Sequence, residues 1–140
     1  MSNNKQKIWI PHILMPELYI NNCNERFWGF DERVDHSGKK AVGFFFDIET
    51  YDEQNVTTIL CPCPVHAVRW TDETGRVNDG RRDNQPNLPM AFVYRIENSD
   101  FSEWLTDQSG GIFTNTRHYE LITCDDVIDI LTYEEPVLFQ

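Results

Sequence analysis

Two carboxylates that could work together stand at the end of an aromatic run. Asp47 and Glu49 close the segment AVGFFFDIE, residues 41–49. Residues two apart on a strand point to the same face, so both carboxylates would point the same way. Such a pair can hold divalent metal ions for phosphodiester hydrolysis. A metal-dependent nuclease that uses Asp47 and Glu49 is therefore one hypothesis for this chain. The alternative is a core strand that ends in an acidic surface.

The string FDIET, residues 46–50, resembles the first motif of the DEDD-type 3′–5′ exonucleases, in which Asp-x-Glu ends the first strand. The resemblance implies a second aspartate on a helix, for which Asp100 is available, and a late aspartate preceded by His or Tyr at a fixed spacing. Here His118 precedes Asp125 by seven residues instead of five, and Tyr119 precedes it by six instead of four. The sequence thus departs from the family pattern at its last motif.

A second candidate set lies in the segment CPCPVH, which contains Cys61, Cys63 and His66. Thiolates and imidazoles are zinc ligands. A fourth ligand would have to come from elsewhere in the chain: Cys23, Cys124 or His118. The spacing C-x-C-x-x-H differs from that of the usual zinc sites, and the chain has no second CxxC. The two prolines explain the segment as a bend between two strands, so we predict no bound metal.

Common catalytic motifs are absent from the sequence. It contains no GxSxG, no GxxxxGK[ST], no GxGxxG and no HExxH. The histidines do not cluster along the chain: they are His12, His36, His66 and His118. We therefore predict a non-enzymatic protein without catalytic residues and without a cofactor.

The charge of the chain is strongly negative and unevenly distributed. The 140 residues hold 12 Lys and Arg against 23 Asp and Glu, a formal net charge of -11. Residues 1–40 are nearly balanced, and no lysine follows Lys40. A protein that binds the nucleic-acid backbone needs a basic face, so the composition argues against direct nucleic-acid binding. With 40% hydrophobic and 13% aromatic residues, the chain is still too apolar for a disordered acidic tail.

The start of the chain predicts no signal peptide, because Pro11 and His12 interrupt its one early apolar run. No apolar stretch is long enough for a membrane span. The four cysteines are expected to be free thiols in a reducing compartment. We therefore expect a cytoplasmic protein with no membrane partner.

Hydrophobic patterns predict a single domain, residues 1–140, with a polar tail at 1–6 and a surface loop at 78–89. Strands are expected where apolar or β-branched residues run together. These segments are 7–15, 41–48, 56–60, 65–70, 90–96, 118–123 and 136–139. The fold class is predicted as α+β, with an antiparallel or mixed sheet of about five to seven strands and two or three short helices on one face.

Two of the predicted helices carry capping signals. In the first, Asn98 or Ser99 would cap a helix that Gly110 and Gly111 end. In the second, Thr123 would cap, and the apolar stripe would be Val127, Ile130 and Leu131. A third, very short helix is expected after Pro16.

Acidic residues gather on the two capped helices and just beyond them. We predict a binding surface that contains Asp100, Glu103, Asp107, Asp125, Asp126, Asp129, Glu134 and Glu135. An anionic face attracts basic partners at a distance and accelerates their association. Such a face can also occupy the phosphate-binding groove of a nucleic-acid-binding protein or nuclease.

These observations together predict a small acidic binding protein that inhibits or antagonises a basic protein partner. Immunity proteins of bacterial toxins and phage-encoded antagonists of host nucleases are similar in size, charge and lack of catalytic motifs. Two alternatives stay open, namely the nuclease described above and an accessory subunit whose acidity serves only solubility. The sequence leaves the oligomeric state open.

Overall fold

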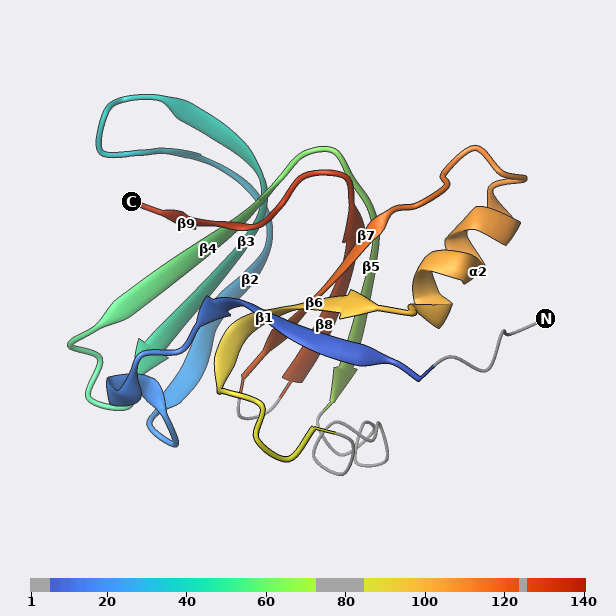
Figure 1. Cartoon of the computed structure of the whole chain (residues 1–140). Helices are drawn as coiled ribbons and strands as arrows, with labels where there is room; N and C mark the ends of the chain where they lie inside the picture. Colours follow the sequence, from blue (N-terminus) through green and yellow to red (C-terminus); the bar gives the residue numbers. More distant parts are fainter. Residues whose placement is uncertain (1–5, 73–84, 124–125) are drawn as a thin grey trace.

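Two antiparallel sheets form most of the molecule (Figure 1). The computed structural model describes residues 6–72, 85–123 and 126–140. The five-stranded sheet has the order β1 (Ile8–Leu14), β6 (Ala91–Glu97), β7 (Arg117–Ile122), β8 (Asp126–Thr132), β5 (Val65–Asp72). The four-stranded sheet has the order β2 (Cys23–Val34), β3 (Lys40–Thr50), β4 (Val56–Pro62), β9 (Val137–Phe139).

The main hydrophobic core lies between the two sheets. From the four-stranded sheet, β3 contributes Phe44, Phe46 and Ile48 at alternate positions, as a strand with one face inward must. From the five-stranded sheet, Leu121 of β7 and Ile128 of β8 enter the same core. The aromatic run at 41–48 thus forms a strand, as the sequence predicted, and this strand lies inside the four-stranded sheet between β2 and β4.

The α+β prediction is wrong, because the described part of the chain is mostly β, with nine strands and one α-helix. The strand count exceeds the predicted five to seven because of β2 and β8. The sequence of β2, CNERFWGFDERV, mixes charged and aromatic residues, and most of its side chains are exposed. An edge strand of this composition lacks the apolar alternation from which strands are predicted.

The second predicted helix is strand β8. The apolar stripe of Val127, Ile130 and Leu131 fits a helix, but Ile128 is also fully buried. A strand between two covered faces buries consecutive residues, whereas a helix of this length would expose part of them. Thr123 does behave locally as a cap, since its hydroxyl accepts a hydrogen bond from the Asp126 amide at 3.2 Å.

The first predicted helix is confirmed as α2 (Asp100–Gln108). Ser99 is the cap, and its side chain accepts a hydrogen bond from the Ser102 amide. Phe101 and Leu105 pack against Leu131 of β8, so the helix covers part of the outer face of the five-stranded sheet. Figure 1 shows α2 (orange) on the side of this sheet that faces away from β3 and β4.

The short helix after Pro16 is present as the 3-10 turn η1 (Glu17–Tyr19). The predicted tail and the predicted loop fall largely outside the described residues. The Gln85 side chain forms hydrogen bonds with the backbone of Trp9 in β1.

Candidate functional site

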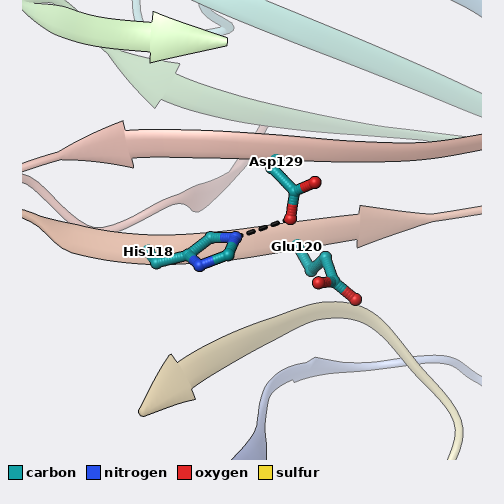
Figure 2. Close-up of side chains that lie close together, drawn as sticks. All are labelled: His118, Glu120 and Asp129. Atoms are coloured by element: carbon teal, nitrogen blue, oxygen red, sulfur yellow. Dashed lines mark hydrogen bonds and ion pairs between the residues drawn. The ribbon is translucent and has the colours of Figure 1, made fainter. Parts of the chain in front are cut away.

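Three polar side chains are buried together on the outer face of the five-stranded sheet. His118 and Glu120 are two residues apart on β7, and Glu120 pairs in register with Asp129 of β8. Residues two apart on one strand share a face of the sheet, and so do residues paired in register on neighbouring strands. All three side chains therefore lie on the same face. Their relative exposures are 2%, 0% and 0%. Figure 2 shows that the His118 ring points toward the Asp129 carboxylate, and its dashed line marks the hydrogen bond between these two residues.

Asp129 is held through both of its carboxylate oxygens. The His118 Nε2 atom lies 2.5 Å from Oδ1. The Arg69 guanidinium donates to Oδ2 through Nη2 at 3.0 Å and Nε at 3.1 Å. Arg69 comes from β5, where it pairs in register with Asp129, and its guanidinium also lies 4.3 Å from the centre of the Phe101 ring. A buried charge is tolerated only when it is paired in this way.

Glu120 has partners from the N-terminal strand. The Lys7 ammonium donates to Oε2 at 2.8 Å, and the Trp9 indole donates to Oε1 at 2.9 Å. The same ammonium lies 4.5 Å from the centre of the Trp9 ring. The carboxylate therefore fixes the start of β1 against β7.

The other ring nitrogen of His118 faces helix α2. The Ser99 hydroxyl lies 2.7 Å from His118 Nδ1 and also accepts the Ser102 amide at 2.9 Å. Because the Asp129 carboxylate only accepts, His118 carries a proton on Nε2. In the neutral ring Nδ1 is then an acceptor, and Ser99 donates to it. Ser99, His118 and Asp129 form a continuous hydrogen-bonded chain that ends at Arg69.

A metal ion is a weak explanation of this cluster. The ligand atoms of His118, Glu120 and Asp129 lie within 4.8 Å of one another, and no other set of three or more such residues does so among the described residues. However, Lys7 and Arg69 already donate to the two carboxylates. A metal ion would have to displace both cations, so the observed partners favour an ion-paired network.

Among the described residues, the candidate zinc ligands Cys61, Cys63 and His66 are not brought together with a further ligand. The His66 ring packs against Phe113, with ring centres 4.4 Å apart, and against Tyr133. Cys61 is buried in the core, and burial raises the pKa of its thiol to about 12. Cys63 is exposed. Cys124 lies outside the described residues.

The Asp-x-Glu pair of the nuclease hypothesis lies on the opposite sheet. Arg33 donates to both oxygens of Asp47, at 2.9 and 3.0 Å, and the Thr58 hydroxyl donates at 2.7 Å. The Asp47 carboxylate accordingly raises the pKa of Arg33. Because these donors occupy the carboxylate, Asp47 has a structural partner where the nuclease hypothesis needs a metal. Asp100, its proposed second aspartate, lies on α2 and not beside it.

The predicted acidic binding residues fall into two groups. Exposed side chains are Asp100, Glu103, Asp107, Glu134 and Glu135, and Asp126 is half-buried. Asp129 is fully buried and cannot be part of an anionic surface, which corrects the prediction for this residue. Asp126 accepts a hydrogen bond from the Trp70 indole at 2.7 Å. Asp125 lies outside the described residues.

Two hollows flank helix α2. The first, of about 360 Å³, is a polar cleft whose lining includes Ser99, Glu103, Arg95 and Arg117. The second, of about 500 Å³, is a groove between α2 and the edge strand β5. Its lining consists of Ala67, Val68, Arg69, Asp100, Phe101 and Trp104.

Sequence reasoning missed the network of Ser99, His118 and Asp129, although one signal was available. Glu120 and Asp129 each stand between aromatic or aliphatic residues in the segments HYELI and VIDIL, and His118 is the first residue of HYELI. A charged residue inside a strongly apolar strand marks a buried, paired group more often than a surface group.

Comparisons with known proteins found no family model, curated protein or solved structure that matches the chain. Within the described residues, no helix has the length and apolar character that crossing a membrane would require.

Proposed function

We propose that this protein binds a basic protein partner through the exposed side of helix α2 and thereby inhibits or antagonises it. One observation carries the proposal. Asp100, Glu103 and Asp107 are all exposed on α2, and Trp104, which is 49% exposed, lies among them beside the 500 Å³ groove. An aromatic anchor surrounded by like charges is typical of an interface that attracts and then holds an oppositely charged partner.

The acidic side of α2 is not neutralised by any other part of the chain that the structure describes. In the described part of the chain, no ion pair involves Asp100, Glu103 or Asp107. Basic side chains instead form ion pairs with buried acidic residues: Arg69 pairs with Asp129, and Arg33 pairs with Asp47. The negative electrostatic potential of these exposed side chains can therefore act on a partner.

The groove beside the helix supplies an apolar contact surface. Phe101 and Ala67 belong to a small core cluster at its floor, and Asp100 stands at its rim. A partner segment that carries an aliphatic side chain next to a lysine or arginine would fit this combination.

A second acidic group lies close to the end of the helix. The Tyr133 hydroxyl donates to the Thr114 carbonyl at 2.8 Å, which holds the segment after β8 against the loop after α2. The exposed Glu134 and Glu135 follow directly. They extend the anionic face beyond α2.

Affinity capture with charge-reversed baits tests the proposal. The variant E103K/D107K reverses two exposed charges on α2, and the control E17K/E53K reverses two exposed charges at the opposite end of the molecule, near η1 and the turn after β3 (Figure 1). Both variants have the same net charge. A protein enriched by the wild type and by E17K/E53K, but lost with E103K/D107K, supports the proposal. Equal capture by all three baits contradicts it.

A further inference from the structure

We propose that Ser99, His118 and Asp129 form a nucleophile–base–carboxylate triad that hydrolyses small anionic carboxylic esters in the 360 Å³ cleft. The activity goes beyond the proposed binding function and does not depend on it. The geometry is complete: Ser99 Oγ lies 2.7 Å from His118 Nδ1, and His118 Nε2 lies 2.5 Å from Asp129 Oδ1. A hydroxyl, a ring nitrogen that accepts its proton and a carboxylate that orients the ring are the parts such catalysis needs.

The two ring nitrogens exchange their usual roles. Nδ1 faces the serine and Nε2 faces the carboxylate, but the chemistry requires only that one nitrogen accepts while the other is held as N–H. Arg69 occupies the second oxygen of Asp129, as the hydrogen bonds that fix a buried orienting carboxylate should. Arg69 and Asp129 therefore position the base, while Ser99 is the group that touches the substrate.

A substrate can reach the Ser99 hydroxyl from the cleft. Ser99 is half-buried and lines the cleft, whereas His118 and Asp129 are buried behind it. The chain turns sharply just before Ser99, where Asn98 has a φ of 58° between the end of β6 and the start of α2. A strand-to-helix turn of this kind presents a nucleophile at the surface of a sheet.

Donors for the developing negative charge lie next to the serine. Amides in the first turn of α2 have no acceptor within the helix, and the positive end of the helix dipole points at this turn. The Asp100 and Phe101 amides follow Ser99 directly. The Ser102 amide donates to Ser99 Oγ at 2.9 Å. These first-turn amides are the donors that we assign to the oxyanion.

The cleft lining defines the substrate class. The guanidinium-bearing Arg95 and Arg117 both line it, together with the hydroxyls of Ser102 and Thr116. Guanidinium groups recognise carboxylates. An ester that carries a free carboxylate a few atoms from the scissile bond would place the carboxylate near the arginines and its carbonyl carbon near Ser99.

The reaction balances without any added oxidant or reductant. Ser99 Oγ bonds to the carbonyl carbon while its proton passes to His118 Nδ1, and the carbon–oxygen bond to the alcohol then breaks. The alcohol leaves with that proton. Water next gives a proton to Nδ1 and its oxygen to the acyl carbon. The bond between that carbon and Ser99 Oγ then breaks, the Nδ1 proton passes to Oγ, and the carboxylic acid is released with the serine hydroxyl restored. Asp129 stays ionised throughout and holds the Nε2 proton.

Covalent labelling with a fluorophosphonate probe, followed by peptide mapping, tests the proposal directly. The serine oxygen displaces fluoride in this reaction, so the expected result is one adduct per chain, on Ser99. The variant S99N removes the nucleophile but keeps a good helix cap, and a thermal unfolding scan confirms that it folds. S37A, which changes a serine in an exposed turn, should label like the wild type.

Turnover of mono-4-nitrophenyl succinate, an ester with a free carboxylate, gives the second readout. The wild type should exceed S99N by about 100-fold or more in kcat/KM, since removal of a triad member costs at least this much. Absence of a Ser99 adduct, or equal hydrolysis by folded S99N, overturns the proposal.

Discussion

Arg69 and Asp129 face each other in register on neighbouring strands, and the guanidinium donates two hydrogen bonds to one carboxylate oxygen. Their pairing connects the edge strand β5 to the buried network of the five-stranded sheet. Asp129 is fully buried, while the Arg69 side chain remains 46% exposed. The buried carboxylate therefore depends in part on Arg69, which lines the groove beside α2.

Substitution D129A should destabilise the protein by about 3–5 kcal/mol, because it leaves His118 buried without its acceptor and removes the partner of Arg69. Substitution R69A should cost less, about 2 kcal/mol, since Arg69 is partly exposed and its charge is screened by water. Urea unfolding of the wild type and both variants measures the difference. A cost for D129A of less than 1 kcal/mol would show that the network contributes little.

Asp47 should prove structural and not metal-binding. The change D47N weakens the contacts with Arg33 and Thr58, so the midpoint of thermal unfolding should fall. Mg²⁺ or Mn²⁺ should not raise the midpoint of the wild type, because Arg33 occupies the carboxylate. Metal-dependent cleavage of single-stranded DNA by the wild type that D47N abolishes would restore the nuclease hypothesis.

The thiol of Cys61 should react only after unfolding. Burial raises its pKa to about 12, so the thiolate is disfavoured in the folded state. Cys63 is exposed and should react with iodoacetamide at pH 8 in the native protein. Peptide mapping after brief alkylation separates the two residues. Equal labelling of Cys61 and Cys63 in the native protein would contradict the packing of β4.

The same burial predicts a loss of stability at high pH. The pKa of Cys61 is higher in the folded than in the unfolded chain, so its contribution is complete below about pH 9 and decreases as the pH rises toward 12. The slope from this one group should approach about 1.4 kcal/mol per pH unit within that window. Urea unfolding of the wild type and of C61A at several pH values isolates the contribution of Cys61. If the free energy of unfolding depends on pH in the same way for both proteins, the raised pKa of Cys61 is refuted.

Gly43 should not tolerate a side chain. A Cβ atom at this position would lie 2.3 Å from the Cys61 carbonyl oxygen on the neighbouring strand, which cannot move without breaking the β3–β4 ladder. We expect G43A to cost about 3 kcal/mol. The control G38A meets no atom within 4 Å but has a φ of 86°, so it should cost only about 1 kcal/mol. Similar unfolding midpoints for both variants would contradict this register.

Local signals predicted those parts of the fold that local interactions determine. Helix α2 has a capping serine at one end and glycines at the other, and the structure uses both. The bend after β4 follows from the prolines next to Cys63. Strand β8 was mistaken for a helix because VIDIL suits either state. The segment forms a strand because it pairs with β7 and β5, and its own sequence carries no information about this pairing.

The candidate sites also differ in whether they depend on local interactions or on contacts between distant segments. The acidic residues of α2 were predictable, because a capped helix with an apolar stripe leaves its charged flank in solvent. The burial of Asp129 was not, because it depends on Arg69, sixty residues away, and on His118. Ser99 was recognised as a cap, but its second partner became visible only when β7 was placed beneath the helix.

The association rate constant between the protein and its captured partner, measured over a range of salt concentrations, tests the central claim most directly. The account predicts that the rate for the wild type and for E17K/E53K falls steeply with added salt. E103K/D107K should associate about tenfold more slowly at low salt, with a flatter salt dependence. Identical rates and salt dependence for the two variants would contradict the claim that the acidic side of α2 is the binding face.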